Sequence, residues 1–470
     1  MASLSKAEPT ARTGSRFPIR LRPVAMLVSA SLIVVATYAF TRPGPMPHPG
    51  AASAPSVTIA TPDGPTAATD DSQAQMEEAI GVWSANLKRD SEDFISATNL
   101  AEVYYSRARL TGNLDDYTRA TEAVRMAIAA YPQGTVGLQL RAQLLFATHD
   151  FGGSLSSAQA ILRAHPDQLA PLATVGDAQL ELGQYSAAGA SFARLAAQAP
   201  GAAVTARLAH LAALRGNVES AQQLAARAIS EQTSADPTPL NHSWYEYLAG
   251  YIAFQFGDLG TAQRQYTAAI ADWPGSYLAI AGLAHTRAAQ GATAEAIELY
   301  KRAIAIVPQP EFVAALGDLY ALSGRKSDAD GQYELVRAIA HLASIQAQVY
   351  NRQLVLFDAN HGENLANALV LAQRELAVRK DVYGWDALAW ALYTNRRYAD
   401  AATAMQTARA LGTVDPLLDY HQGMIDAALG RTEQARRLLT AALERNPGFD
   451  PLQAARARST LNTLDDGMSR

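Results

Sequence analysis

The sequence contains no cysteine among its 470 residues. Disulfide bonds, thiolate metal sites and a lipid-modified cysteine anchor are therefore excluded. Motifs of hydrolase and nucleotide chemistry are also missing: there is no HExxH, no GxSxG, and no glycine-rich loop followed by Lys-Ser or Lys-Thr. We therefore expect no enzymatic activity, no catalytic residue, no metal site and no cofactor.

Positive charge is scarce outside the N-terminus. The whole chain has a net charge of −5, whereas residues 1–42 have a net charge of +5, which leaves −10 for the remainder. The basic residues of this segment are Lys6, Arg12, Arg16, Arg20, Arg22 and Arg42, against the single acid Glu8. Because a nucleic-acid-binding body carries basic patches, we expect no nucleic-acid partner.

Residues 23–40 (PVAMLVSASLIVVATYAF) carry no charged side chain. As a helix this run would be about 27 Å long, close to the thickness of a bilayer's hydrocarbon core. The basic flank before it predicts that the N-terminus stays in the cytoplasm. The sequence thus predicts a cytoplasmic tail at 1–22, a single-pass signal-anchor helix at 23–40 in the cytoplasmic (inner) membrane, and an extracytoplasmic remainder.

A cleaved secretory signal is the alternative, because Thr37-Tyr38-Ala39 resembles a cleavage site of small residues. The apolar run is longer than the core of a usual signal peptide, which favours the uncleaved anchor. Cleavage would give a secreted or periplasmic protein, so both interpretations place the body outside the cytoplasm. Residues 41–72 are rich in Pro, Ala, Gly, Ser and Thr and predict an extended stalk.

Beyond the stalk, one set of spacings recurs along the chain. Each copy starts at a small or alanine residue, here called the reference residue, and has a turn residue at +7 and an alanine at +12. Several copies end in proline at +24. The reference residues are Gly176, Ala209, Gly250, Ala284, Gly317, Ala389 and Gly423. Recurrence at a fixed period indicates a repeat array rather than one globular domain.

The copy that starts at Ala284 shows what each position does. Apolar residues fall at helical spacings on both sides of Gly291, so the copy predicts two amphipathic helices joined by a tight turn. Glycine supplies the left-handed backbone that ends the first helix, and Pro308 ends the second. Tyr300 and its counterparts would fill the space between neighbouring pairs.

These spacings resemble those of the tetratricopeptide repeat family, whose unit of about 34 residues has small, turn-glycine, alanine, aromatic and proline positions in this order. The resemblance implies an all-α, right-handed superhelical solenoid of about ten helix-turn-helix pairs at 73–465, following the transmembrane helix. Irregular pairs are expected at 94–168 and 341–380. A helix near 73–89 would cap one end of the stack, and one at 451–464 the other.

Few polar residues stand out as candidates for a site. His210, His285, Asp177 and Asp318 all lie one position after a reference residue, where they would face the same groove. Scattered histidines on helix surfaces are ordinary, and the ligand count is too low for a metal site. We interpret the four as possible contacts to a bound peptide.

An aromatic stripe is the strongest candidate. Trp244, Tyr247, Tyr251 and Phe254 are spaced three, four and three residues apart and share one helix face. The family resemblance implies that this face points into the concave groove, without an obvious partner inside the chain. Tyr383, Trp390 and Tyr393 repeat the theme near the C-terminus. Aromatics at helical spacing are also common in cores, which is the alternative.

Taken together, these features predict a membrane-anchored, extracytoplasmic protein-protein interaction scaffold that holds a peptide segment or partner protein in its groove. The alternative is a carbohydrate or envelope-polymer-binding module, in which the groove aromatics would stack on sugar rings. A peptide binder should present polar groove residues, whereas a glycan binder should expose Trp and Tyr there.

Overall fold

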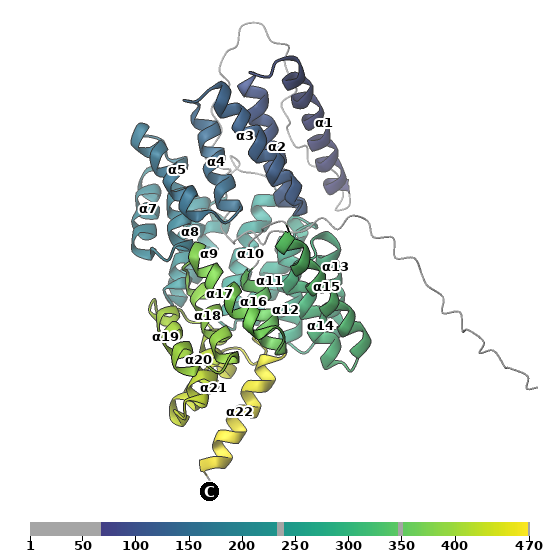
Figure 1. Cartoon of the computed structure of the whole chain (residues 1–470), viewed down its shortest axis with the longest axis vertical. Helices are drawn as coiled ribbons and strands as arrows, with labels where there is room; N and C mark the ends of the chain where they lie inside the picture. Colours follow the sequence, from purple (N-terminus) through teal and green to yellow (C-terminus); the bar gives the residue numbers. More distant parts are fainter. Residues whose placement is uncertain (1–66, 233–238, 346–350, 469–470) are drawn as a thin grey trace, which may run out of the picture.

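The computed structural model describes residues 67–232, 239–345 and 351–468, and this part of the chain is entirely helical. Its 22 helices form ten consecutive antiparallel pairs, from α2–α3 to α20–α21, with α1 and α22 outside the pairs (Figure 1). The helices are α1 Ala67–Arg89, α2 Phe94–Thr111, α3 Leu114–Ala130, α4 Thr135–Ala147, α5 Phe151–Ala164, α6 Ala170–Glu181, α7 Tyr185–Gln198, α8 Ala202–Leu214, α9 Val218–Ser230, α10 Pro239–Gln255, α11 Leu259–Asp272, α12 Tyr277–Ala289, α13 Thr293–Ile306, α14 Pro310–Leu322, α15 Lys326–Ile345, α16 Asn351–His361, α17 Leu365–Val378, α18 Val382–Thr394, α19 Tyr398–Arg409, α20 Pro416–Ala428, α21 Thr432–Arg445 and α22 Gln453–Met468.

The turn inside each pair forms as its sequence predicts. Gly257, for example, has a φ of 84°, in the left-handed region that glycine adopts without a steric penalty. Asp258 then caps α11, because its carboxylate accepts a hydrogen bond from the Thr261 backbone N–H at 2.9 Å. Where glycine is missing, His149 and Arg396 adopt the same positive φ. The turn geometry is therefore constant even where its residue is not.

Small reference residues allow the helices to pack closely around an aromatic ring. Tyr266 of α11 is 2% exposed, and a Cβ added at Gly250 would lie 2.8 Å from its ring. A Cβ on Gly282 of the following pair would overlap the same ring. Ala262 and Ala296, both at +12, are fully buried. The ring thus fills the space between two neighbouring pairs, as the repeat pattern predicts.

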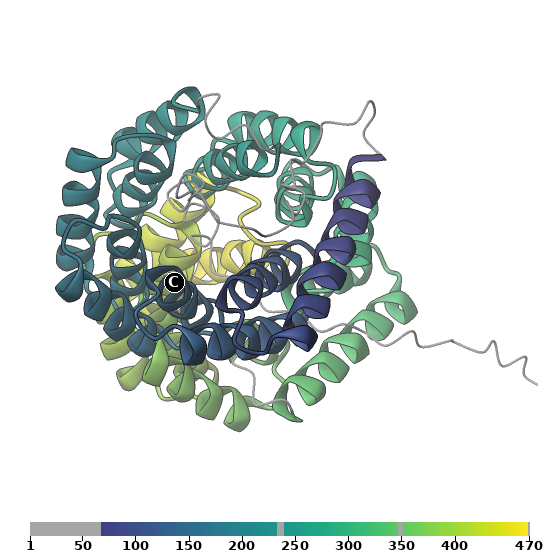
Figure 2. The same ribbon diagram turned by 90° about the horizontal axis from the view of Figure 1, so that it is seen from above.

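The pairs wind into a superhelix of two stacked turns. Viewed from above, the purple-to-teal helices follow a ring (Figure 2), and in Figure 1 the helices α18 to α22 lie below the first helices. Hydrogen bonds join residues 159 to 199 positions apart, such as Val382 N–H to the Tyr185 hydroxyl at 2.8 Å and Gln255 Nε2 to the Val414 carbonyl at 3.1 Å. The second turn therefore packs directly beneath the first.

Helix lengths vary along the array. Helices α2 and α3 have 18 and 17 residues, longer than the 12 to 14 of most others. Helix α15 has 20 residues, and α16 and α17 form the degenerate pair near 341–380. Whether α15 runs into α16 lies outside the described residues, because positions 346–350 are not described.

The predicted N-terminal segments lie almost entirely outside the described residues. They are the tail at 1–22, the anchor at 23–40 and the stalk at 41–72, of which only residues 67–72 are described. Helix α1 begins at Ala67, six residues earlier than the expected start at 73. Within the part of the chain that the structure describes, no helix is both long and apolar enough to span a bilayer.

Candidate functional site

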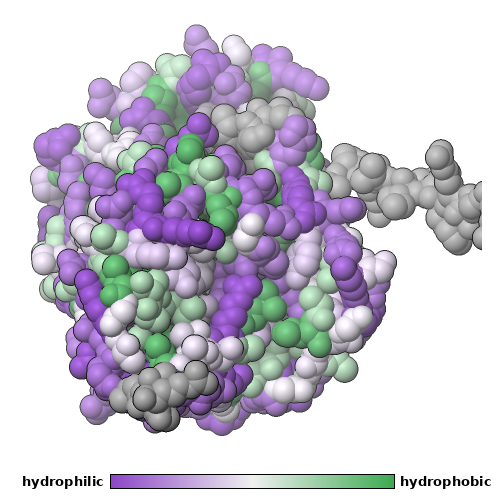
Figure 3. Space-filling view, turned by 60° about the horizontal axis from the view of Figure 1, so that its bottom comes forward, coloured by the Kyte–Doolittle hydropathy of each residue, from purple (hydrophilic) through white to green (hydrophobic). Residues whose placement is uncertain are grey.

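The first helices of the pairs line the inside of the ring formed by the first turn. Arg109 of α2 lies close enough to Tyr277 of α12 to lower the pKa of its hydroxyl, although burial raises that pKa overall, to about 12. The carboxylate of Glu311 on α14 raises the pKa of the same hydroxyl. We call the ring-facing side of α2, α4, α6, α8, α10, α12 and α14 the inner surface. On the face shown in Figure 3, hydrophobic patches are small and separated by hydrophilic side chains.

Many polar atoms on these helices or at their N-terminal ends are buried without a hydrogen-bond partner. Such groups are uncommon in folded proteins, because each loses its hydration without compensation. Among the residues that carry them, His210, His285 and Glu311 are only half-buried, so a bound segment can reach these three with its backbone N–H and C=O groups. The atoms are Tyr105 Oη, Gln139 Oε1, His210 Nδ1, Ser243 Oγ, His285 Nε2, both side-chain polar atoms of Gln309, and Glu311 Oε2.

Two glutamates of the inner surface have strongly raised pKa values. Burial raises the pKa of Glu102 on α2 and of Glu311 on α14 to about 7, from an ordinary value of 4.5. Neither carboxylate forms an ion pair with another described residue within 4 Å. Glu311 lies six positions before the reference residue Gly317, and Trp244 and Tyr383 occupy the same position in their own copies. This repeat position therefore carries a carboxylate as well as aromatic residues.

Glu311→Gln should stabilise the protein in a pH-dependent manner. Since the folded pKa of about 7 lies above 4.5, the folded state holds the proton more tightly than the unfolded state. The gain from removing the charge is absent below pH 4.5, grows as the pH rises, and reaches about 2–3 kcal/mol above pH 7. Urea denaturation at pH 4.5 and pH 8 measures it; an equal effect at both pH values would contradict the assignment.

The two predicted aspartates are held in ion pairs inside the repeat stack. Asp177 is buried and receives two hydrogen bonds of 2.8 Å from the guanidinium of Arg207. Asp318 accepts hydrogen bonds from the Tyr333 hydroxyl at 2.8 Å and from His361 at 2.9 Å. Both carboxylates therefore join neighbouring pairs, and their expected role as free peptide contacts is not supported.

The two predicted histidines are half-buried and uncharged at neutral pH. Burial lowers the pKa of His210 and of His285 to about 4. The His285 ring contacts Phe254 with a centroid distance of 4.3 Å and is hydrogen-bonded to the Phe449 backbone. One nitrogen of each ring has no partner. These histidines remain candidates for contacts with a bound segment.

The aromatic stripe is not an exposed surface, contrary to the sequence prediction. Trp244 and Tyr247 are only 7% and 8% exposed, while Tyr251 and Phe254 are half-buried, and all four belong to or pack against one core cluster. Trp244 meets the Tyr245 ring edge-on at 5.4 Å. These rings pack against neighbouring pairs and the second turn as well as within their own pair, and such contacts do not show in the sequence of one pair.

The C-terminal aromatics are also packed within the chain. Trp390 is 2% exposed, lies between the rings of Tyr393 and His421 at 4.6 and 4.1 Å, and donates a hydrogen bond to Asn360 at 2.8 Å. Tyr393 is half-buried beside it. Rings covered on both faces cannot stack on a sugar, which removes the main argument for carbohydrate binding.

Tyr251 and Tyr383, predicted from separate copies, meet between the two turns. Their hydroxyl groups are hydrogen-bonded to each other. Tyr383 also donates to Asp415 at 3.0 Å and accepts from Gln255 at 3.2 Å. Burial raises the pKa of Asp415 to about 6. This polar cluster joins the first turn to the second, so Tyr383 has a structural role.

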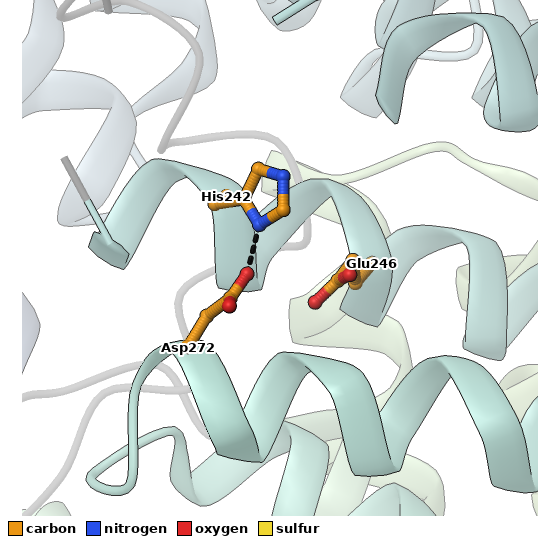
Figure 4. Close-up of side chains that lie close together, drawn as sticks. All are labelled: His242, Glu246 and Asp272. Atoms are coloured by element: carbon orange, nitrogen blue, oxygen red, sulfur yellow. Dashed lines mark hydrogen bonds and ion pairs between the residues drawn. The ribbon is translucent and has the colours of Figure 1, made fainter. Parts of the chain in front are cut away.

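A further cluster, which the sequence reasoning missed, lies at the open end of the α10–α11 hairpin. His242, Glu246 and Asp272 point toward one another (Figure 4), and one potential ligand atom from each lies within 4.8 Å of the others. His242 and Glu246 are four residues apart on one helix, which is the signal that could have pointed to them. Asp272 ends the antiparallel partner helix, so only the folded hairpin reveals it.

The repeat pattern is matched by known family models. Tetratricopeptide repeat models match residues 253–319 and 387–448, which span the end of α10 to α14 and α18 to α21. The chain contains tetratricopeptide repeats. Such repeats generally mediate protein-protein interactions, and folds built from them are typically non-catalytic.

Three solved structures match this chain with low sequence identity. The APC/C Cut9–Hcn1 hetero-tetramer matches with 14% identity and a TM-score of 0.31, covering 83% of this chain and 93% of the other. A tetratricopeptide repeat protein from Parabacteroides merdae matches with 16% identity and a TM-score of 0.35, covering 51% of this chain and 93% of the other. The type IV pilus biogenesis factor PilW matches with 18% identity and a TM-score of 0.38, covering 44% of this chain and 93% of the other. No curated protein matches.

Some turn glycines of these tetratricopeptide repeats have a second role between the superhelical turns. A Cβ on Gly183, Gly216 or Gly257 would overlap or closely approach the carbonyl oxygen of Lys380, Gly412 or Arg445 in the second turn. The turn glycines Gly291, Gly324 and Gly430 have the same positive φ but no atom within 4 Å of such a Cβ. The first three therefore allow close contact between the turns.

Gly257→Ala should destabilise the protein more than Gly291→Ala. Both variants force alanine into a left-handed backbone, with φ of 84° and 80°, at a cost of about 1–2 kcal/mol. Only Gly257→Ala also displaces the Arg445 backbone, which we expect to cost a further 1–3 kcal/mol or so. Urea denaturation measures the difference. Equal losses would show that the turns do not touch here.

Proposed function

We propose that this chain is a membrane-anchored scaffold outside the cytoplasm that binds an extended segment of a partner protein on the inner surface of its first turn. The observation that carries the proposal is that three half-buried side chains of that surface, His210, His285 and Glu311, each have a polar atom without a hydrogen-bond partner. Glu102 and Glu311 add carboxylates with no ion pair among the described residues. A segment carrying a Lys or Arg side chain would complement them.

A capture assay from solubilised membranes tests this binding. The double variant Glu102→Ala with Glu311→Ala should reduce the affinity for the captured partner at least about tenfold, the effect of losing a binding hot spot. Glu122 and Glu298 are exposed, with side chains 58% and 70% accessible, so alanine at both is the matched control. Equal capture by both double variants would reject the inner surface as the binding site.

The membrane anchor makes a separate prediction about topology. Arginines precede the apolar run at 23–40, so the solenoid should lie outside the cytoplasmic membrane. Protease added to intact spheroplasts should therefore digest residues 90–461, and the same residues should sediment with membranes before digestion. Protection of the solenoid would contradict the orientation, and a soluble solenoid released without protease would indicate cleavage of residues 1–40.

A further inference from the structure

The three side chains at the open end of the α10–α11 hairpin come from two helices. His242 and Glu246 lie one helical turn apart near the start of α10, and Asp272 is the last residue of α11 (Figure 4). His242 Nδ1 directly contacts Asp272 Oδ2. The hairpin therefore places one imidazole nitrogen and two carboxylates around a common point.

Glu246 provides an independent indication that a ligand belongs here. It is 8% exposed, and its Oε2 atom is buried without a hydrogen-bond partner. Four positions before their reference residues, three other copies have the buried core residues Leu172, Ile280 and Val313, and a fourth has Asp419, which pairs with Arg409. A buried carboxylate costs stability unless a positive charge or a donor meets it. Burial accordingly raises the pKa of Glu246 to about 7.

In the preceding copy, the side chains at the two repeat positions that correspond to Glu246 and Asp272 pair with each other without a metal. There Thr205, at −4, donates a hydrogen bond to Glu231, at +22. Glu246 and Asp272 occupy the same two positions, −4 and +22, in the next copy. Both side chains are carboxylates, so neither can donate a hydrogen bond to the other when ionised. A cation between them would replace the missing donor.

We propose that His242, Glu246 and Asp272 bind a divalent transition-metal ion, for which Zn²⁺ is the best fit. One imidazole and two carboxylates suit Zn²⁺ better than Mg²⁺ or Ca²⁺, which prefer shells of oxygen ligands. Three protein ligands leave a fourth position for water or a partner's side chain. The ion would tie the start of α10 to the end of α11, independently of the proposed binding on the inner surface.

The test uses the full-length chain in detergent, purified with a histidine-free tag and treated with a chelator. Titration with Zn²⁺ against a chromogenic chelator should give one tight site per chain, and Zn²⁺ but not Mg²⁺ should raise the melting temperature. Co²⁺ should give a visible ligand-field band. Glu246→Gln or Asp272→Asn should lower Zn²⁺ affinity at least about tenfold and weaken that band.

His361→Gln is the matched control. His361 also pairs with an aspartate, since its Nε2 lies 2.9 Å from Asp318 Oδ1. This pair has no third potential ligand: among the described residues, only His242, Glu246 and Asp272 form a cluster of three that could hold a metal ion. This variant should therefore bind Zn²⁺ like the wild type. The proposal is overturned if the wild type binds no Zn²⁺ tightly, or if Glu246→Gln and Asp272→Asn, with native circular dichroism, keep its affinity. Two variants are included because Asp272 is only half-buried, so Asp272→Asn should fold even if Glu246→Gln does not.

Discussion

Arg207→Ala is expected to lower the free energy of unfolding by about 3–5 kcal/mol, because it leaves the Asp177 carboxylate buried without its partner. The Arg207 side chain is 1% exposed and that of Asp177 4%. The guanidinium also donates to the Ala203 carbonyl at 3.0 Å, so the substitution removes three hydrogen bonds. Urea denaturation followed by circular dichroism measures the loss.

Arg227→Ala is the control for Arg207→Ala. Arg227 pairs with Glu231 on the same helix face, but its side chain is 60% exposed, so its removal should cost less than about 0.5 kcal/mol. The loss in Arg207→Ala should also be smaller at pH 5 than at pH 8, since protonation removes the uncompensated charge of Asp177. Similar losses in both variants would show that the Arg207–Asp177 pair is not buried.

Trp244→Ala should also destabilise the protein by about 3–5 kcal/mol, since it removes a large side chain from a packed core. An exposed binding stripe would predict almost no change in stability. Tyr131→Ala is the matched control, because Tyr131 is 47% exposed and should cost at most about 1 kcal/mol. Thermal melting of both variants decides between a core residue and a surface residue.

Most of the fold could be predicted from the sequence because each repeat is specified locally. The spacing of Gly250, Gly257 and Ala262 is enough to predict α10, its turn and α11. Ten pairs and two flanking helices were expected and are present in the described residues. Turns without glycine can also be located from the spacing, because His149 and Arg396 stand at turn positions and adopt the positive φ of the turn.

Contacts between the superhelical turns could not be predicted, since they depend on the winding of the whole array. Nothing in the sequence near Tyr251 and Gln255 indicates their hydrogen bonds to Tyr383 and to the Val414 carbonyl. This is why the aromatic residues were interpreted as exposed. The same limit applied to Glu246, because a glutamate on a helix is usually solvated and only the fold shows that it is buried.

The central claim, that a partner segment lies on the inner surface of the first turn, is tested most directly by photo-crosslinking in cells. A photoreactive amino acid replaces Glu102 or Glu311 on the inner surface, or Glu122 or Glu298 on the exposed surface. The account predicts a partner adduct of one mass from both inner positions and none from the outer positions. Adducts from the outer positions alone would contradict it, as would the absence of any adduct from positions 102 and 311.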